Sequence, residues 1–369
     1  MTKKKITRED LSIAAEKYKN WGKWGPNDEI GTLNYTTAND IVEASRLVNQ
    51  GKVISLALNF DSSGPQGAKS KYQSLGRINP LHTMLRTGTD AYSGVLDQRG
   101  IRAADDMIVM PLQSGTQWDG LGHVFYENYM WNGYDCREVT SSGAQKCGIE
   151  KTKNKMVGRG VLLDVPREMG VARLEDGYGI TCEDLDRTAK SQQVEIKRGD
   201  YVIVRTGQME EMLKAGSWDG YPGGDAPGFA FETLDWLQEK EISAIASDTW
   251  GCEVRPNEAE EGINQPWHWI TIPIMGITMG EIFFLGDLLI LVIIVQIQTY
   301  QIYWMPLRHP SLNLFLRQQW KKNCSLVIIY HRAVTKWLFH QTQYPLNLIL
   351  KCSIYFDDQF LVKDNFSNI

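Results

Sequence analysis

The sequence predicts an α/β protein in which helices flank a mixed sheet. Short apolar runs, with the length and composition of buried strands, recur along most of the chain. Segments with apolar residues at helical spacing separate these runs, and glycine and proline mark the turns between them. This alternation of strands and helices is typical of the α/β class, and the chain contains no internal repeat.

Four segments have the spacing of helices that bury one face. They are residues 7–20, 38–48, 181–191 and 231–240. Thr7 and Thr181 stand at the start of the first and third segments, where a hydroxyl can accept a hydrogen bond from a free backbone N–H. Asn34 or Thr36 can do the same for the second segment. We therefore expect three of the helices to begin at side-chain caps.

Apolar runs predict the strands of the sheet and the rest of the core. The strands are expected at residues 53–58, 161–165, 200–205 and 245–248, and two further apolar runs, 270–274 and 280–285, are expected to continue the core. Residues 61–106 are polar and punctuated by glycine, which predicts a long surface loop with short elements.

The segment 106–134 contains the side chains of greatest chemical interest. Its first residues alternate in polarity, so a strand is expected to enter the segment. If the extended backbone continues, Gln113, Gln117 and Asp119 fall on one face, and His123 follows four residues later. Oxygen donors and an imidazole at this range can hold a divalent metal. From the spacing alone, such a set more often forms a hydrogen-bond network beneath a loop than a metal site.

The same segment resembles the signature of the cyclase family that contains bacterial kynurenine formamidase and isatin hydrolase. That signature is His, any residue, Gly, Thr, His, any residue, Asp, and a further His four positions later. In this chain the positions hold Gln113, Gly115, Thr116, Gln117, Asp119 and His123. Both glutamines stand where the family has histidine. The resemblance continues in family order through residues 21–35, 158–165, 197–207, 227–237, 246–253 and 267–289.

The resemblance implies a swivelling β/β/α-type fold and a metal-dependent hydrolase. The bond cleaved would be an amide, formamide or lactam bond in a small aromatic substrate, as in an arylformamidase of tryptophan catabolism. In such chemistry a water molecule activated by a divalent ion attacks the carbonyl carbon. The family also tends to form homo-oligomers, so we expect a homo-oligomer here.

The resemblance also assigns roles to residues. Asp119 would be the anionic metal ligand, and His123 would take the proton of the attacking water and pass it to the leaving nitrogen. The remaining positions of the metal centre would be Gln113, Gln117, His268 and Glu281. For His268 and Glu281 the alternative is a core histidine and a glutamate that caps a turn.

Two glutamines in place of histidines change the expected metal chemistry. An amide oxygen is a harder and weaker donor than imidazole, so the site should lose affinity for zinc and favour manganese or magnesium. A two-metal centre is not expected. The alternative is a catalytically inactive homologue that binds a ligand at the same place, disabled by the substitutions at Gln113 and Gln117 or by an aberrant C-terminus.

Other charged and aromatic residues accompany the site segments. Asp248 ends a predicted strand. Its carboxylate can either hydrogen-bond to a metal ligand or cap a helix or turn. Arg205 is interpreted as a structural cation rather than a substrate clamp. Several aromatic residues flank the site segments, which suits an apolar pocket for a planar substrate, although most can equally belong to the core. They are Trp118, Phe125, Tyr126, Trp131, Trp250, Trp267 and Trp269.

Composition excludes several classes of protein. A formal net charge of -5 over 369 residues argues against a nucleic-acid surface. The longest apolar run, residues 288–295, is too short to span a bilayer, and no apolar segment follows the basic start as in a signal peptide. The 6 cysteines are widely spaced, which favours reduced thiols. We therefore expect a cytoplasmic protein that binds neither nucleic acid nor membrane.

The last part of the chain differs from the rest. All 33 glycines lie in the first 286 residues, and residues 287–369 contain neither glycine nor glutamate. We divide the chain into a cyclase-family hydrolase domain, residues 1–289, and a non-family tail, residues 290–369. The tail is interpreted as the product of a frameshift in the gene or as an unrelated extension. Such a tail is expected to leave the sheet without its last strand.

Overall fold

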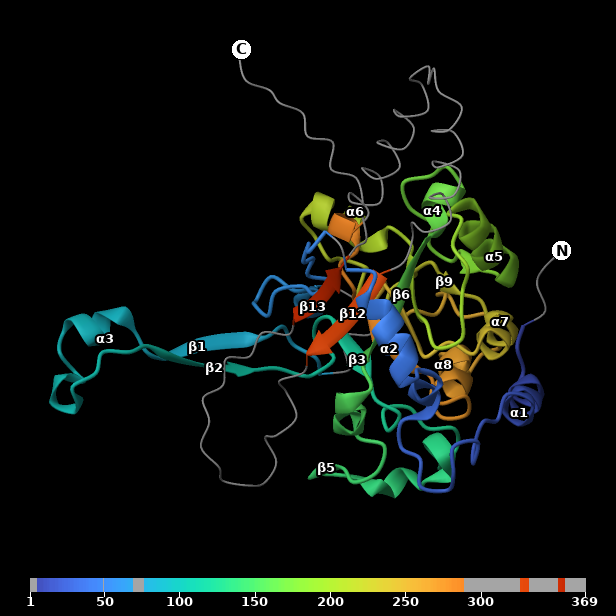
Figure 1. Cartoon of the computed structure of the whole chain (residues 1–369), viewed down its shortest axis with the longest axis horizontal. Helices are drawn as coiled ribbons and strands as arrows, with labels where there is room; N and C mark the ends of the chain where they lie inside the picture. Colours follow the sequence, from blue (N-terminus) through green and yellow to red (C-terminus); the bar gives the residue numbers. More distant parts are fainter. Residues whose placement is uncertain (1–4, 49, 69–75, 289–325, 332–350, 356–369) are drawn as a thin grey trace, which may run out of the picture.

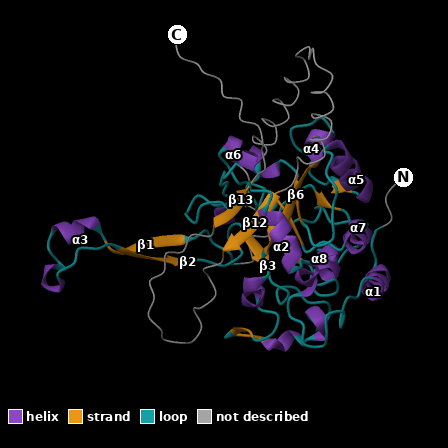
Figure 2. Ribbon diagram, in the orientation of Figure 1, coloured by secondary structure: helices purple, strands orange, loops and turns teal. Residues whose placement is uncertain are grey.

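A mixed sheet forms the centre of the protein, as the sequence predicts (Figures 1 and 2). The computed structural model describes residues 5–48, 50–68, 76–288, 326–331 and 351–355. The strand order is β13-β12-β6-β8-β10-β11-β3. Five of these strands are β3 (Gln117–Asp119), β6 (Val157–Asp164), β8 (Tyr201–Arg205), β10 (Ala244–Ser247) and β11 (Thr278–Glu281). Neighbours from β6 to β11 run parallel, whereas β3 runs antiparallel to β11.

The parallel strands are buried on both faces. In β6, Val161 and Leu163 contribute to one part of the core, whereas Leu162 contributes to the other. This is why the strand reads as a continuous apolar run rather than as an alternating one. The first part of the core also contains buried side chains of four helices, α1 (Arg8–Lys17), α5 (Cys182–Ser191), α7 (Thr233–Lys240) and α8 (Pro266–Thr271). Short α4 (Val165–Glu168) packs on α5, and α2 (Ala38–Ser45) packs on β6.

Side-chain caps start three of the four predicted helices, with one correction. Thr7 caps α1 and Thr181 caps α5, each in a reciprocal box with an aspartate three residues later. For α2 the cap is Thr37, and the prediction of Asn34 or Thr36 is wrong. Thr37 is the residue with an aspartate three positions later, so it alone can complete the box.

Two predicted segments adopt other structures. Residues 53–58 form no strand, because Leu56 and Leu58 make isolated hydrogen bonds to Phe284 and to the Thr116 hydroxyl instead of a ladder. The apolar run 270–274 falls at the end of α8 and the turn after it. In both segments the backbone hydrogen bonds go to individual residues and not to a neighbouring strand.

The predicted surface loop 61–106 contains a projecting hairpin, which we call the arm. Strands β1 (Leu81–Arg86) and β2 (Asp105–Val109) pair antiparallel, and α3 (Gly88–Tyr92) lies at the far end. Figure 1 shows the arm extending away from the sheet and the helices. The strand expected to run through residues 108–112 therefore ends at Val109.

The tail contributes two strands to the sheet. β12 (Leu326–His331) pairs antiparallel with β6, and β13 (Lys351–Tyr355) pairs with β12. The expectation that the tail leaves the sheet without a last strand is therefore wrong. The domain boundary at residue 289 remains a prediction.

Two further findings concern the cysteines and the helices of the described residues. Cys136, Cys147, Cys182 and Cys252 are free thiols. No helix within the described residues combines the length and apolar character needed to cross a bilayer.

The start of β8 generates a testable pH dependence. Asp200 is buried, and its Oδ2 accepts a hydrogen bond from the Lys197 backbone N–H at 2.7 Å. Burial raises the pKa of Asp200 to about 6, although Arg159, with Nε 3.7 Å from its carboxylate, opposes the shift. The folded protein therefore holds this proton more tightly than the unfolded chain does.

We expect the contribution of Asp200 to the free energy of unfolding to decrease as the pH rises from about 4 to about 6. Its contribution should be constant below about pH 4, fall by roughly 2 to 3 kcal/mol on the way to pH 6, and level off above that. Asp200→Asn removes this contribution, so the variant should gain stability relative to the wild type between the two pH values. Urea unfolding of both proteins across this range measures the effect, and parallel pH profiles would contradict it.

Candidate functional site

The pairing of β3 with β11 places the predicted acidic residues together. Gln117 lies opposite Glu281, and Asp119 lies opposite Met279. Opposed residues of antiparallel strands project to the same face, so these side chains share one side of the sheet. Met279 packs with the core that includes α8, which places α8 over the same side. Trp118 projects to the other side and joins the core there.

Two glutamine side chains connect the carboxylates. Gln113 Nε2 donates to Asp119 Oδ1 at 2.6 Å. Gln117 Nε2 donates to Gln113 Oε1 at 2.7 Å and to Glu281 Oε2 at 2.6 Å. The chain turns between β2 and β3, so the expectation of one extended strand through Gln113 is wrong. The Gln113 side chain nevertheless reaches the same cluster.

His268 enters the cluster from α8 and lies between two glutamates. Its Nδ1 is 2.7 Å from Glu253 Oε2, and its Nε2 is 3.4 Å from Glu281 Oε1. Burial opposes a charge on the imidazole, but the hydrogen bonds to Glu253 and Glu281 outweigh burial and raise the pKa of His268 to about 10. The carboxylate of Glu253 thereby fixes the orientation of the ring.

Glu253 was not predicted as a site residue. It is buried, and it also accepts hydrogen bonds from the backbone N–H groups of Trp267 and His268. Its place at the end of the family-like segment 246–253 is the only signal that the sequence offered. Gln265 was missed as well, and its Nε2 lies 3.5 Å from His268 Nε2.

His123 lies at the solvent-exposed side of the cluster. Its Nε2 is 4.0 Å from Asp119 Oδ1, and its side chain is 38% exposed, whereas that of Asp119 is 1% exposed. A substrate or water molecule can therefore reach His123 from solvent, while the residues behind it are shielded. The six residues predicted for the site thus form one continuous chain of contacts, from His123 through Asp119 and the two glutamines to Glu281 and His268.

The charge balance of the cluster favours a cation. Burial, and after it the charge of Asp119, raises the pKa of Glu281. Asp119 Oδ2 and Gln117 Oε1 are buried oxygens without a hydrogen-bond partner. Buried acceptors of this kind are costly unless a donor or an ion satisfies them.

The donor set fits a divalent ion through oxygen ligands. Within the described residues no group of three or more His, Cys, Asp and Glu side chains is arranged to hold a metal by itself. The two unpartnered oxygens, on Asp119 and Gln117, add a carboxylate and an amide donor beside Glu281 and His268.

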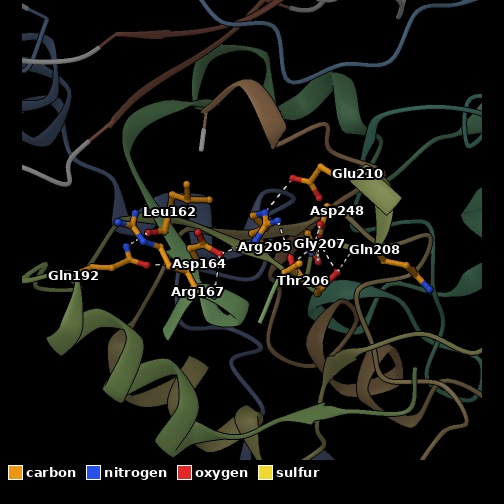
Figure 3. Close-up of polar contacts among 12 residues, drawn as sticks. Leu162, Asp164, Arg167, Gln192, Arg205, Thr206, Gly207, Gln208, Glu210 and Asp248 are labelled. Atoms are coloured by element: carbon orange, nitrogen blue, oxygen red, sulfur yellow. Dashed lines mark hydrogen bonds and ion pairs between the residues drawn. The ribbon is translucent and has the colours of Figure 1, made fainter. Parts of the chain in front are cut away.

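The other predicted charged residues have structural roles. Arg205 lies between Asp164 and Glu210, with nitrogen–oxygen distances of 2.8 and 3.0 Å, as a structural cation should (Figure 3). Asp248 Oδ1 accepts hydrogen bonds from the backbone N–H and the hydroxyl of Thr206. Of its two predicted roles, Asp248 therefore has that of a cap. Burial, and next the charge of Glu210, raises the pKa of Asp248.

Most of the flanking aromatic residues belong to the core. Trp267 is fully buried and stacks on Phe229 with ring centroids 5.0 Å apart. Trp118 packs edge-on against Phe283 at 5.1 Å, and Trp131 is also fully buried. These rings therefore support the strands that carry the site rather than lining it.

Comparison with known proteins identifies the family of this chain. The family described as putative cyclase matches residues 10–254. The chain belongs to the cyclase family. A crystal structure of a protein described as a novel cyclase is 36% identical, with 74% of this chain and 88% of that chain covered and a TM-score of 0.64. No curated protein matches.

More distant solved structures are also similar to this chain. Isatin hydrolase A from Labrenzia aggregata, bound to benzyl benzoate, is 18% identical over 69% of this chain and 88% of that chain, with a TM-score of 0.45. Isatin hydrolase A from Ralstonia solanacearum is 15% identical over 67% of this chain and 85% of that chain, with a TM-score of 0.47.

Thr116, which matches the family signature, connects the site segment to two distant segments of the chain. Its hydroxyl donates to the Ile282 carbonyl and accepts from the Leu58 backbone N–H. We expect Thr116→Val to lower the free energy of unfolding by roughly 2 to 4 kcal/mol, because a side chain of the same shape leaves two backbone groups unpaired. Thr116→Ser keeps the hydroxyl and should lose much less. Chemical denaturation tests this, and equal losses in both variants would argue against the hydrogen bonds as the cause.

Proposed function

We propose that this protein is a hydrolase that cleaves the amide, formamide or lactam bond of a small aromatic substrate. The observation that carries the proposal is the contact of His123, Asp119, Glu281 and His268 in one cluster that is buried except at His123. A shielded acidic centre with one accessible imidazole can bind a polar group of a substrate and move a proton beside it. Membership of the cyclase family supports the same class of reaction.

Each residue has a distinct task in this proposal. His123 accepts the proton of the attacking water and delivers it to the leaving nitrogen, because it is the imidazole that solvent and substrate reach. Asp119 orients His123 at 4.0 Å and provides a buried negative charge beside the proton that moves. Glu253 holds the ring of His268, and His268 in turn faces Glu281.

A divalent metal is part of the proposal. Asp119, Gln117, Glu281 and His268 would hold it, and when bound it would supply the positive charge that makes water acidic and polarises a carbonyl. The amide nitrogen of Gln113 donates a hydrogen bond to Asp119 Oδ1 and so holds this carboxylate in place. Manganese and magnesium suit these oxygen donors better than zinc.

One observation favours a second candidate function. The amide nitrogens of both glutamines already donate to the carboxylates, so the cluster satisfies part of its hydrogen-bonding capacity without an ion. A homologue of this kind can bind a polar ligand without hydrolysing it. This alternative is an inactive ligand-binding protein on the same scaffold.

Metal content and hydrolysis can be measured on the same three variants. Asp119→Asn should lose the bound metal and at least ~100-fold in the rate of hydrolysis, whereas His123→Asn should keep the metal and lose ~100-fold or more in rate. Asp200→Asn, which removes a buried carboxylate elsewhere, should retain both properties. Mass spectrometry of the metal and a panel of aryl formamides and lactams provide the two measurements.

The outcomes separate the two candidate functions. Folded wild-type protein that contains no metal and hydrolyses nothing on the panel would contradict the hydrolase and favour the ligand-binding alternative. Equal loss of metal in Asp119→Asn and Asp200→Asn would show that the effect is not local to the cluster. If His123→Asn remained active, another group would have to move the proton.

A further inference from the structure

Arg77 lies against an aromatic ring and has no acidic partner. It precedes β1, and its guanidinium carbon is 5.0 Å from the centroid of the Trp250 ring. In the part of the chain that the structure describes, no carboxylate lies within ion-pairing distance of Arg77, whereas Arg102 on the arm pairs with Asp97 at 2.9 Å. A guanidinium held over an aromatic face keeps its N–H donors for another partner.

Trp250 places Arg77 beside the candidate site. The Trp250 ring packs with Ile282, which directly follows Glu281 in the chain. On the other side of the indole residue, a Cβ atom added to Gly251 would lie 3.8 Å from Glu281 Oε1. The residues next to Trp250 in sequence and in space therefore adjoin the acidic cluster, and the guanidinium on its ring is a neighbour of that cluster.

The indole of Trp250 has a polar atom without a partner. Trp250 is 8% exposed, and its Nε1 is a buried donor that makes no hydrogen bond. Buried donors are usually paired, so an unpaired one indicates that a ligand supplies the acceptor. The indole N–H and the guanidinium of Arg77 can donate hydrogen bonds but cannot accept them. Two donors of this kind in contact match the oxygens of an anion, and a carboxylate offers two such oxygens.

The charge of the neighbouring cluster makes this cation necessary for an anionic substrate. Asp119 and Glu281 are buried carboxylates, and they would repel a substrate that carries a negative charge. Arg77 is not used to neutralise either of them, because it forms no ion pair with them. Its charge therefore remains available to offset that of a bound carboxylate, whereas a neutral aromatic substrate has no need of a guanidinium at this place.

We propose that Arg77 determines the specificity of the candidate site by binding a carboxylate group of the aromatic substrate, with the Trp250 N–H as a second donor. This inference rests on the proposed hydrolysis of an aromatic amide, formamide or lactam, and it narrows the substrates to anions. The carboxylate is unchanged by the reaction and serves only for binding. Arg205 cannot take this role, because Asp164 and Glu210 already occupy its guanidinium.

Paired substrates test the proposal on the full chain. The three isomers of formamidobenzoate carry a carboxylate, and formanilide is their neutral counterpart. Wild-type protein should prefer the best isomer over formanilide by at least ~10-fold in kcat/KM, because charge-assisted hydrogen bonds hold the carboxylate. Arg77→Gln should lower this preference by at least ~10-fold, chiefly through KM, and Arg77→Lys should restore part of it.

Two further variants refine the kinetic test. Trp250→Phe keeps an aromatic ring and removes the N–H, so it should lower the preference for the anion by about 3-fold. Arg102→Gln removes an exposed, ion-paired arginine of the arm and should keep the wild-type preference. Circular dichroism reports whether each variant is folded.

Binding of benzoate, measured by isothermal titration calorimetry, does not require hydrolysis. Arg77→Gln should weaken benzoate binding by at least ~10-fold relative to the wild type, whereas Arg102→Gln should not change it. Any contribution of a bound metal to benzoate affinity is common to all three proteins, so the comparison isolates Arg77.

The outcomes distinguish this inference from the proposed function. Benzoate binding that depends on Arg77, without hydrolysis of any formamide or lactam, would overturn the proposed function and support the anion site. Hydrolysis with the same preference in the wild type and in Arg77→Gln would overturn the anion site and leave the proposed function in place. Wild-type protein that neither prefers the anionic substrates nor binds benzoate would also overturn the anion site.

Discussion

The pairing of β3 with β11 is the interaction on which the candidate site depends. Its register sets Gln117 against Glu281 and projects Asp119 to the same side. A slip of one residue would turn all three side chains to the other face of the sheet, because the side-chain period of a strand is two residues. Thr116 secures this register through a hydrogen bond to the backbone just beyond Glu281. The chemistry of the site is therefore tied to the edge of the central sheet.

Charge is the second constraint. Asp119, Glu253 and Glu281 are buried together, and His268 is the buried imidazole among them. Buried carboxylates are stable only when donors or opposite charges satisfy them. The glutamine amides provide donors without charge, so they complete hydrogen bonds but leave the excess of negative charge in place. This imbalance is the physical reason that a cation suits the cluster.

The central parallel strands provide a rigid support for this arrangement. β6, β8 and β10 are buried on both faces, and charged residues lie at or just beyond their carboxyl ends. Figure 3 shows Arg205 and Asp248 joining these ends through ion pairs and hydrogen bonds. The arm has the opposite character, since it lies outside this core and exposes apolar residues. The same chain thus combines a buried core with a projecting element that exposes apolar side chains.

Local rules determined a large part of this protein from its sequence. Hydroxyl caps such as Thr7 and continuous apolar runs such as that of β6 act over a few residues, so they predict helix starts and buried strands. The resemblance to the family signature pointed to Gln113, Gln117, Asp119 and His123, and the structure brings these residues into one cluster. Tertiary structure alone decided that Glu253 supports His268, that residues 53–58 form no strand, and that the arm projects from the sheet. Each of these depends on which distant segment supplies the hydrogen-bond partner, and pairing over long separations leaves no pattern in the local sequence.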